Sequence, residues 1–126
     1  MAKGISERFP HSHRIVRSVD YKDIYEAGNK IHSEKFVLFG RENSLGHARL
    51  GITVSRKIGC ASKRNRIKRL FREIFRRSSA EIPNNIDMVV NAKSGCAEAG
   101  FVELREEFIA TARRMARKVY SSRDRA

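Results

Sequence analysis

One stretch of the chain, residues 56–77, collects the side chains best suited to binding a polyanion. It holds ten Lys or Arg residues and a single acid, Glu73, so it carries +9 of a formal net charge of +13 over 126 residues. Guanidinium and ammonium groups bind phosphate through charge-assisted hydrogen bonds. The sequence therefore predicts a polyanionic partner, with nucleic acid ahead of an anionic membrane or an acidic protein.

The apolar residues of the same stretch predict a helix. They recur at i, i+3, i+4, i+7 and i+8, which places them in one stripe that packs on a core while the basic residues face outward. The stripe consists of Ile67, Leu70, Phe71, Ile74 and Phe75.

Several basic residues lie at positions where they are expected to destabilise the helix. Lys63, Arg64 and Arg66 lie beside the positive N-terminal end of this helix, where each like charge costs a few tenths of a kcal/mol or more. The final helix does the reverse, with acids toward its start and bases toward its end. A conflict with a local rule is expected at functional positions. Unpaired N–H groups at a helix start already attract phosphate.

Three alternative roles for the basic helix are open. A charge run is commonly a solvated face, but such a face mixes signs, and here Glu73 is the lone acid. Basic amphipathic helices also bind anionic lipid, yet this apolar stripe is needed to close the core of a small domain. A DNA major groove would fit Arg and Asn, but a strand, rather than a partner helix, precedes this one.

Patterning along the chain predicts one αβ domain over residues 1–126, with tails at about 1–8 and 121–126. Gly28 should stop the first helix, and residues 43–46 suggest a hairpin between two strands. The expected elements are a helix capped by Ser18, strands at 30–32, 35–41 and 49–55, the basic helix, a strand at 86–92 and a helix at about 100–120.

Several classes of function find no support in the sequence. Cys60 and Cys96 have no metal-ligand spacing and are expected to be free thiols. We assign no metal ligand and no catalytic triad or carboxylate pair. The longest apolar run, residues 36–39, is far shorter than the roughly 20 residues that cross a bilayer. The N-terminus has no apolar stretch typical of an export signal, so we expect a cytoplasmic protein that binds no membrane and no DNA.

Two adjacent motifs resemble the protein subunit of bacterial ribonuclease P. Residues 50–59 read Leu-Gly-Ile-Thr-Val-Ser-Arg-Lys-Ile-Gly, and residues 64–70 read Arg-Asn-Arg-Ile-Lys-Arg-Leu. Looser similarity at residues 19–28, 86–90 and 101–104 extends the resemblance over nearly the whole chain. Cys60 replaces an Asn that is common in the family and suited to an N-cap, so Ser62 is the candidate cap instead. Tyr21 and Tyr25 stand where the family often has Phe.

The resemblance implies an α+β fold, a single mixed four-stranded sheet in the order α-β-β-β-α-β-α. The basic helix would form a left-handed βαβ crossover, as in the ribosomal protein S5 domain 2-like fold, although crossovers are ordinarily right-handed. It also implies an accessory role in an enzyme whose RNA subunit carries the chemistry. That RNA uses magnesium to hydrolyse one phosphodiester and release the 5′ leader of precursor tRNA, while the protein raises substrate and magnesium affinity.

The resemblance further implies two binding surfaces. The first would contact the catalytic RNA through Arg56, Lys57, Lys63, Arg64, Asn65, Arg66, Lys68, Arg69 and Arg72. The second is a cleft for the single-stranded leader, where stacking on an aromatic ring contributes roughly 1–3 kcal/mol per base with little sequence preference. Its expected residues are Phe9, Arg17, Tyr21, Tyr25 and Phe39.

A structural RNA-binding protein, such as a ribosomal protein, is the alternative of another class. Such proteins are also small, basic and poor in catalytic groups. The feature that favours ribonuclease P is the Ser-Arg-Lys-Ile-Gly turn followed by Arg-Asn-Arg.

Overall fold

The structure, a computed structural model, describes the backbone of residues 11–125 and the side chains of residues 12–120. Phe9 and the expected tail at 1–8 lie outside these residues. The predicted class and order of elements are confirmed. The helices and strands are α2 (Ser18–Glu26), β1 (Asn29–His32), β2 (Phe36–Glu42), β3 (Arg49–Thr53), α3 (Ala61–Arg77), β4 (Ile86–Ala92) and α4 (Phe101–Arg125).

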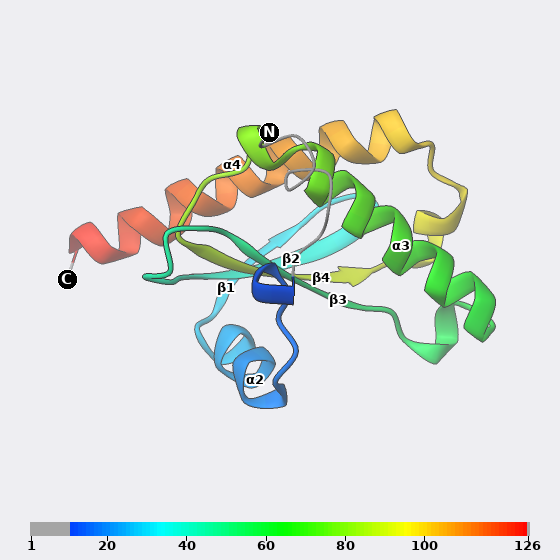
Figure 1. The fold of residues 1–126 in the computed structure, drawn as a ribbon, viewed down its shortest axis with the longest axis horizontal. Coiled ribbons are helices and arrows are strands. Elements are labelled where there is room, and N and C mark those ends of the chain that lie inside the picture. Colours follow the sequence, from blue (N-terminus) through cyan, green and yellow to red (C-terminus); the bar gives the residue numbers. More distant parts are fainter. Residues whose placement is uncertain (1–10, 126) are drawn as a thin grey trace.

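The four strands form one mixed sheet in the order β1-β2-β4-β3 (Figure 1). β2 pairs antiparallel with both β1 and β4, whereas β3 pairs parallel with β4. The basic helix α3 thus connects two neighbouring parallel strands, as the resemblance implied. The left-handed sense of this crossover stays a prediction.

The predicted hairpin at residues 43–46 is wrong, because β2 and β3 are not neighbours. β4 lies between them, and five of its seven residues are buried. The intervening loop instead bonds to the segment before β4: Asn43 N–H donates to Asn85 O at 2.8 Å, and Gly46 N–H donates to Asn85 Oδ1 at 2.7 Å. The most apolar strand takes the centre of the sheet, and the loop passes over its end.

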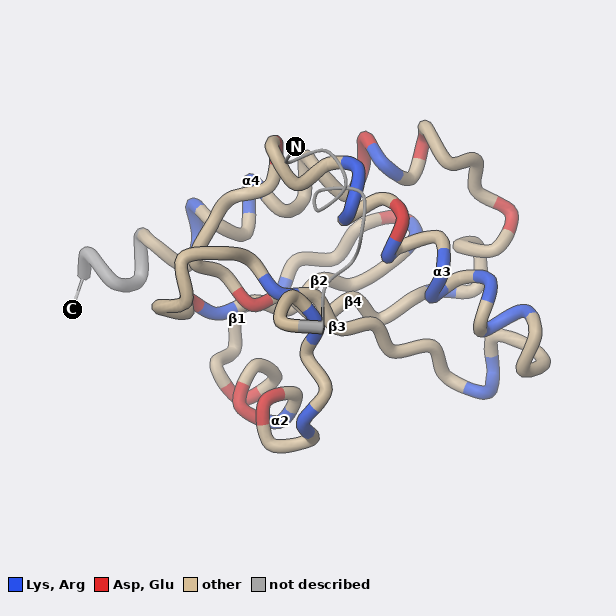
Figure 2. The backbone as a smooth tube through the Cα atoms, in the orientation of Figure 1, with Lys and Arg blue, Asp and Glu red and all other residues tan. Residues whose placement is uncertain are grey.

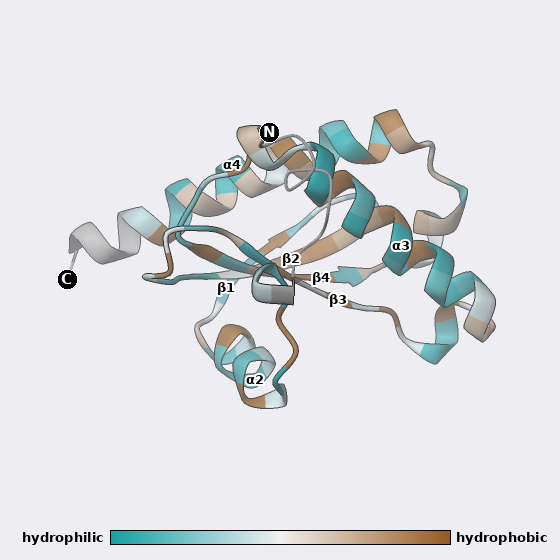
Figure 3. Ribbon diagram, in the orientation of Figure 1, coloured by the Kyte–Doolittle hydropathy of each residue, from teal (hydrophilic) through white to brown (hydrophobic). Residues whose placement is uncertain are grey.

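Helices cover both faces of the sheet. α3 and α4 lie on one face, α2 on the other (Figure 1), and apolar and polar bands alternate along α3 (Figure 3). The predicted stripe is confirmed: four of its residues are buried and Leu70 is partly buried. Phe71 packs against Phe36 and Phe108, with ring centroids 5.5 and 6.2 Å apart. The smaller core on the α2 face contains Ile15, Ile24 and Val89.

Helix ends differ from the predictions in detail. The N-cap of α2 is Arg17 rather than Ser18, and Gly28, at φ 80°, follows its end as expected. Cys60 occupies the N-cap of α3 without a side-chain cap hydrogen bond, so Ser62 lies inside the first turn and does not cap. The backbone of α4 remains helical to Arg125, about five residues further than expected. Among the described residues, no helix combines the length and the apolar character that crossing a membrane requires.

A buried carboxylate fixes the start of β4 to its neighbouring strands. Asp87 is fully buried, and it accepts hydrogen bonds from Arg49 at 2.8 Å, Arg41 at 3.1 Å and Asn43 at 2.7 Å. Arg41 and Arg49 also lie 3.6 and 3.8 Å from Asp20 on α2. The same two guanidinium groups therefore tie the helix on one face to three strands of the sheet.

The partners of Asp87 favour its ionised form over its protonated form. Burial alone would raise its pKa, but the hydrogen bonds from Arg49 and Asn43 and the charges of the two arginines outweigh burial, and the pKa lies below its usual value. A carboxylate whose pKa is lower in the folded protein stabilises that state above its unfolded pKa, about 3.9 for Asp, and loses this contribution as pH falls through the folded value.

Removal of Asp87 tests this network. Asp87→Ala removes the shared buried partner of two partly buried guanidinium groups, which keep only the longer contacts with Asp20 and Asp23, and should lower the free energy of unfolding at pH 7 by about 1–3 kcal/mol. The control Asp23→Ala removes a partly exposed contact with Arg41 and should cost less than about 1 kcal/mol. Urea unfolding at pH 7 and pH 3 should show the stabilities of Asp87→Ala and the wild type converging in acid. A difference between these two proteins that is equally large at both pH values would contradict the network.

Candidate nucleic-acid interface

Most of the positive charge in the first two-thirds of α3 has no acidic partner in the described part of the chain. Lys and Arg recur along the helix (Figure 2), and the preceding turn adds exposed Arg56 and Lys57. Arg66, Arg69 and Arg72 are exposed, and in the described part of the chain none of them forms a salt bridge. Lys68 is partly buried, and Asn65 is exposed. The RNA-binding residues expected from the sequence therefore all lie on α3 or on the turn that precedes it.

Two basic residues of the first turn have partners within the protein. Lys63 Nζ lies 3.7 Å from Glu98, in a partly exposed pair. Arg64 donates to the Gly59 carbonyl oxygen at 2.7 Å, so it supports the turn that leads into the helix. Arg64 thus has a structural role that its position alone did not indicate.

The last turn of α3 is neutralised, in contrast to its start. Glu73 pairs with both Arg76 and Arg77, and hydrogen bonds from these two residues lower the pKa of Glu73. Arg77 also lies over the Phe101 ring, 5.7 Å from its centroid. The uncompensated charge is thereby concentrated toward the N-terminal end.

A hollow of about 540 Å³ follows the exposed charge. It lies between α3 and the short 3-10 turn Ser94–Glu98, and its rim brings together guanidinium groups, an amide and a hydroxyl. These groups donate hydrogen bonds to phosphate oxygens. The hollow is lined by Ser62, Lys63, Asn65, Arg66, Arg69, Ala97 and Glu98.

The aromatic residues expected in a second site meet on the α2 face of the sheet. Tyr25 packs edge-on against Phe39, with ring centroids 4.7 Å apart, and its hydroxyl donates to Asn91 Oδ1 at 3.0 Å. Tyr21 precedes Tyr25 by one helical turn and is half-buried. Arg17 is exposed at the start of α2. The structure thus brings Tyr21, Tyr25 and Phe39 together.

Tyr21, in the aromatic cluster, lies close enough to the basic surface for the charge of Arg72 to affect its pKa. Burial raises the pKa of its hydroxyl, and a hydrogen bond with the Ile52 backbone and the positive charge of Arg72 partly offset that rise. The Tyr21 ring lies directly over Gly51: a Cβ at this position would be 2.6 Å from the Tyr21 hydroxyl oxygen. The sequence contained this glycine within its signature strand, but only the helix–sheet contact shows why a side chain is excluded.

Sequence reasoning missed a cation beside these rings. Lys30 Nζ lies 5.9 Å from the Phe39 centroid, within the range of a cation–π interaction. The pairing of β1 with β2 places Lys30 opposite Phe39. The sequence predicted a strand at residues 30–32, but not which strand it lies beside.

No cluster for a protein-bound metal occurs on the described part of either surface. Among residues 12–120, no three His, Cys, Asp or Glu side chains come together in an arrangement that could hold a metal ion. Cys60 is exposed and Cys96 is buried, and both are free thiols.

An α+β domain with an uncompensated basic helix on one side and an aromatic cluster on the other is typical of proteins that bind nucleic acid. The model of the family described as Ribonuclease P matches residues 9–116. The chain therefore belongs to the ribonuclease P protein family.

Individual relatives agree with this assignment. The chain is 38% identical over 94 residues to the ribonuclease P protein component of Thermotoga petrophila, an alignment that covers 75% of this chain and 80% of the relative. Among solved structures it is similar to the RNase P protein from Thermotoga maritima, with a TM-score of 0.75 and 36% identity over 80% of this chain and 96% of that one. The Staphylococcus aureus RNase P protein has a TM-score of 0.72 and 31% identity over 85% and 96% of the two chains.

A double-mutant cycle tests the contact between Tyr21 and Gly51. Gly51→Ala should lower the free energy of unfolding by about 1–3 kcal/mol, because the new methyl group overlaps the ring. In a Tyr21→Ala background the same substitution should cost at least about 0.5 kcal/mol less, as is usual for residues in contact. Chemical denaturation of the four proteins provides the comparison. Equal costs in the two backgrounds would show that Gly51 is required for another reason.

Proposed function

We propose that this protein is the RNA-binding subunit of a ribonuclease P ribonucleoprotein, which removes the 5′ leader from precursor tRNA. The observation that carries the proposal is the positive charge of Arg66, Arg69 and Arg72 on α3, which has no acidic partner among the described residues, in a chain of this family. The catalytic groups reside on the RNA subunit, and the protein works in the cytoplasm with that RNA and precursor tRNA as its partners.

In this proposal α3 and the turn before it bind the backbone of the catalytic RNA. The exposed arginines supply planar, multidentate donors, and Asn65 adds an amide between them. Because RNA phosphates would neutralise these cations, the cost of placing like charges side by side on one helix is recovered in the complex. Loss of single phosphate contacts should weaken binding and reduce its dependence on salt.

The aromatic cluster on the α2 face binds the single-stranded leader. Phe39, Tyr21 and Tyr25 are only partly buried, so ring surface is available to bases. Stacking on a ring tolerates every base, which suits an enzyme that must accept many leaders. Arg17 and Arg72 flank the cluster from α2 and α3 and contact leader phosphates.

Magnesium in this account is bound mainly by the RNA. The described residues offer no set of three ligands, so we assign no metal ion to the protein itself. The cations of the protein lower the repulsion between catalytic RNA and substrate and thereby reduce the magnesium concentration that assembly requires.

Reconstitution tests the proposed function. Purified protein added to its cognate catalytic RNA at low magnesium should increase the rate of precursor tRNA cleavage, and it should have little effect at high magnesium, where screening by the metal replaces the protein. Gel separation of leader and mature tRNA measures the rate. Tight binding to ribosomal RNA with no stimulation at any magnesium concentration would favour a structural RNA-binding protein instead.

A further inference from the structure

We propose that the RNA strand held by the aromatic cluster continues across the sheet to its β1 edge, where Lys30, His32, Arg114 and Lys118 bind its phosphates. We call these four residues the β1 edge site. The inference rests on the proposed leader cleft and extends it to residues that the family motifs do not include.

Strand register provides a track from one edge of the sheet to the other. One row of paired residues on the α2 face runs from β3 to β1 as Gly51, Val89, Phe39 and Lys30. Tyr21 and Ile24 of α2 cover the part of this row nearest β3. The row therefore leads from beneath the helix, past the Phe39 ring, to a lysine at the edge.

A second row lies beside the first and is more open. It runs as Thr53, Asn91, Val37 and His32, of which Thr53 and His32 are exposed and the other two partly buried. Four strands about 4.8 Å apart make this surface roughly 14 Å wide. A flat face of this width, with rings on one side and polar groups on the other, fits a single strand rather than a duplex.

Cations mark both ends of the track. Near the β3 edge, the positive charge of Arg72 acts to lower the pKa of the Tyr21 hydroxyl. Near the β1 edge, Lys30 lies over the Phe39 ring. An ammonium group next to a stacking ring is well placed to bind the phosphate that joins two stacked bases.

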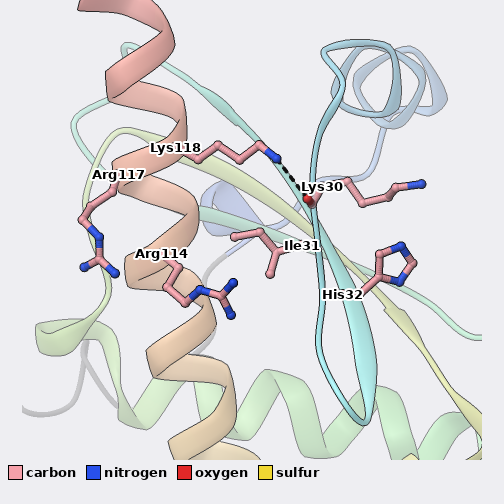
Figure 4. Close-up of a pocket in the computed structure, with 6 residues that line it drawn as sticks. All are labelled: Lys30, Ile31, His32, Arg114, Arg117 and Lys118. Atoms are coloured by element: carbon pink, nitrogen blue, oxygen red, sulfur yellow. Dashed lines mark hydrogen bonds between the residues drawn. The ribbon is translucent and has the colours of Figure 1, made fainter.

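The positive surface continues around the β1 edge to the other face. Figure 4 shows the Lys30 and His32 side chains on one side of β1 and Ile31 on the other, toward α4. Lys118 reaches across from α4 and donates to the Lys30 carbonyl oxygen at 3.2 Å, which leaves further N–H groups for a ligand. Arg114 points toward the strand, and among the described residues no acid lines this groove of about 400 Å³. Since β1 is the outer strand, no other strand of residues 11–125 covers the edge.

Helix stability is the competing reason for these α4 cations, since Lys and Arg are good helix formers at exposed positions. Arg113 separates the two roles. It is exposed on the same helix turn as Arg114 but does not line the groove. Stability alone would make the two arginines equivalent, whereas phosphate binding would not.

The experiment uses the reconstituted holoenzyme and precursor tRNAs with short and long leaders. The test variant is Lys30→Gln/Arg114→Gln. The control is Lys22→Gln/Arg113→Gln, which removes the same charge from exposed positions outside the track. We expect the test variant to lose most of the affinity gained from the longer leader, and the salt slope for the long-leader substrate to fall by about 0.7 per lost phosphate contact. Affinity for mature tRNA should not change, and the control should behave as the wild type.

Two contrary results are distinguishable. Equal losses in the test and control variants, with a wild type that prefers the longer leader, would overturn the β1 edge site and leave the proposed function standing. A wild-type holoenzyme indifferent to leader length would overturn the leader cleft together with its extension.

Discussion

The structure depends on how α3 packs, and this packing opposes the charge preference of the helix. Its apolar stripe must lie on the sheet, because Phe71 and its neighbours complete the main core. This orientation directs the basic residues outward and leaves them next to the positive end of the helix dipole. The protein relieves the conflict only in part: Glu98 approaches Lys63, whereas Arg66 and Arg69 have no acidic partner among the described residues. A polyanion that binds here gains a surface already held in place by the core.

The sheet gives the protein a second, chemically different surface. Its central strand, β4, is buried on both faces, so α2 must cover part of the face opposite α3. Asp87 and its two arginines hold α2 there, and the lack of a side chain at Gly51 lets Tyr21 approach the sheet. A charged interface for RNA backbone and an aromatic interface for unpaired bases thus share one small core, with Arg72 near the boundary between them.

Local patterns predicted most of the fold, because helices and strands in this chain follow regular apolar spacing. The apolar stripe of α3 identified the helix residues that pack into the main core. The hairpin prediction failed because strand adjacency is decided by which strand is most apolar, and β4, some forty residues later, occupies the centre. In the sequence Asp87 is an isolated acid in an apolar run, and only the tertiary structure reveals that three side chains hold it.

The candidate site shows the same division. Charge and spacing predicted an outward-facing basic helix, and family resemblance supplied its individual RNA contacts and the aromatic residues, whose binding roles stay predictions. The hydrogen bond from Arg64 to Gly59 and the position of Lys30 over Phe39 depend on backbone geometry that no sequence period encodes. Phe9 lies outside the described residues, so its proposed part in the cleft stays a prediction.

The most direct test of the central claim compares stability and RNA affinity in one variant, Arg66→Gln/Arg69→Gln. We predict an unchanged or higher melting temperature, because Arg66 and Arg69 are like charges three residues apart on one helix, together with weaker binding to the catalytic RNA and a shallower salt dependence. Arg77→Gln, which removes a paired arginine from the last turn, serves as the control and should affect RNA binding little. A marked fall in melting temperature with RNA affinity intact would contradict the account, since it would show that these cations serve the fold.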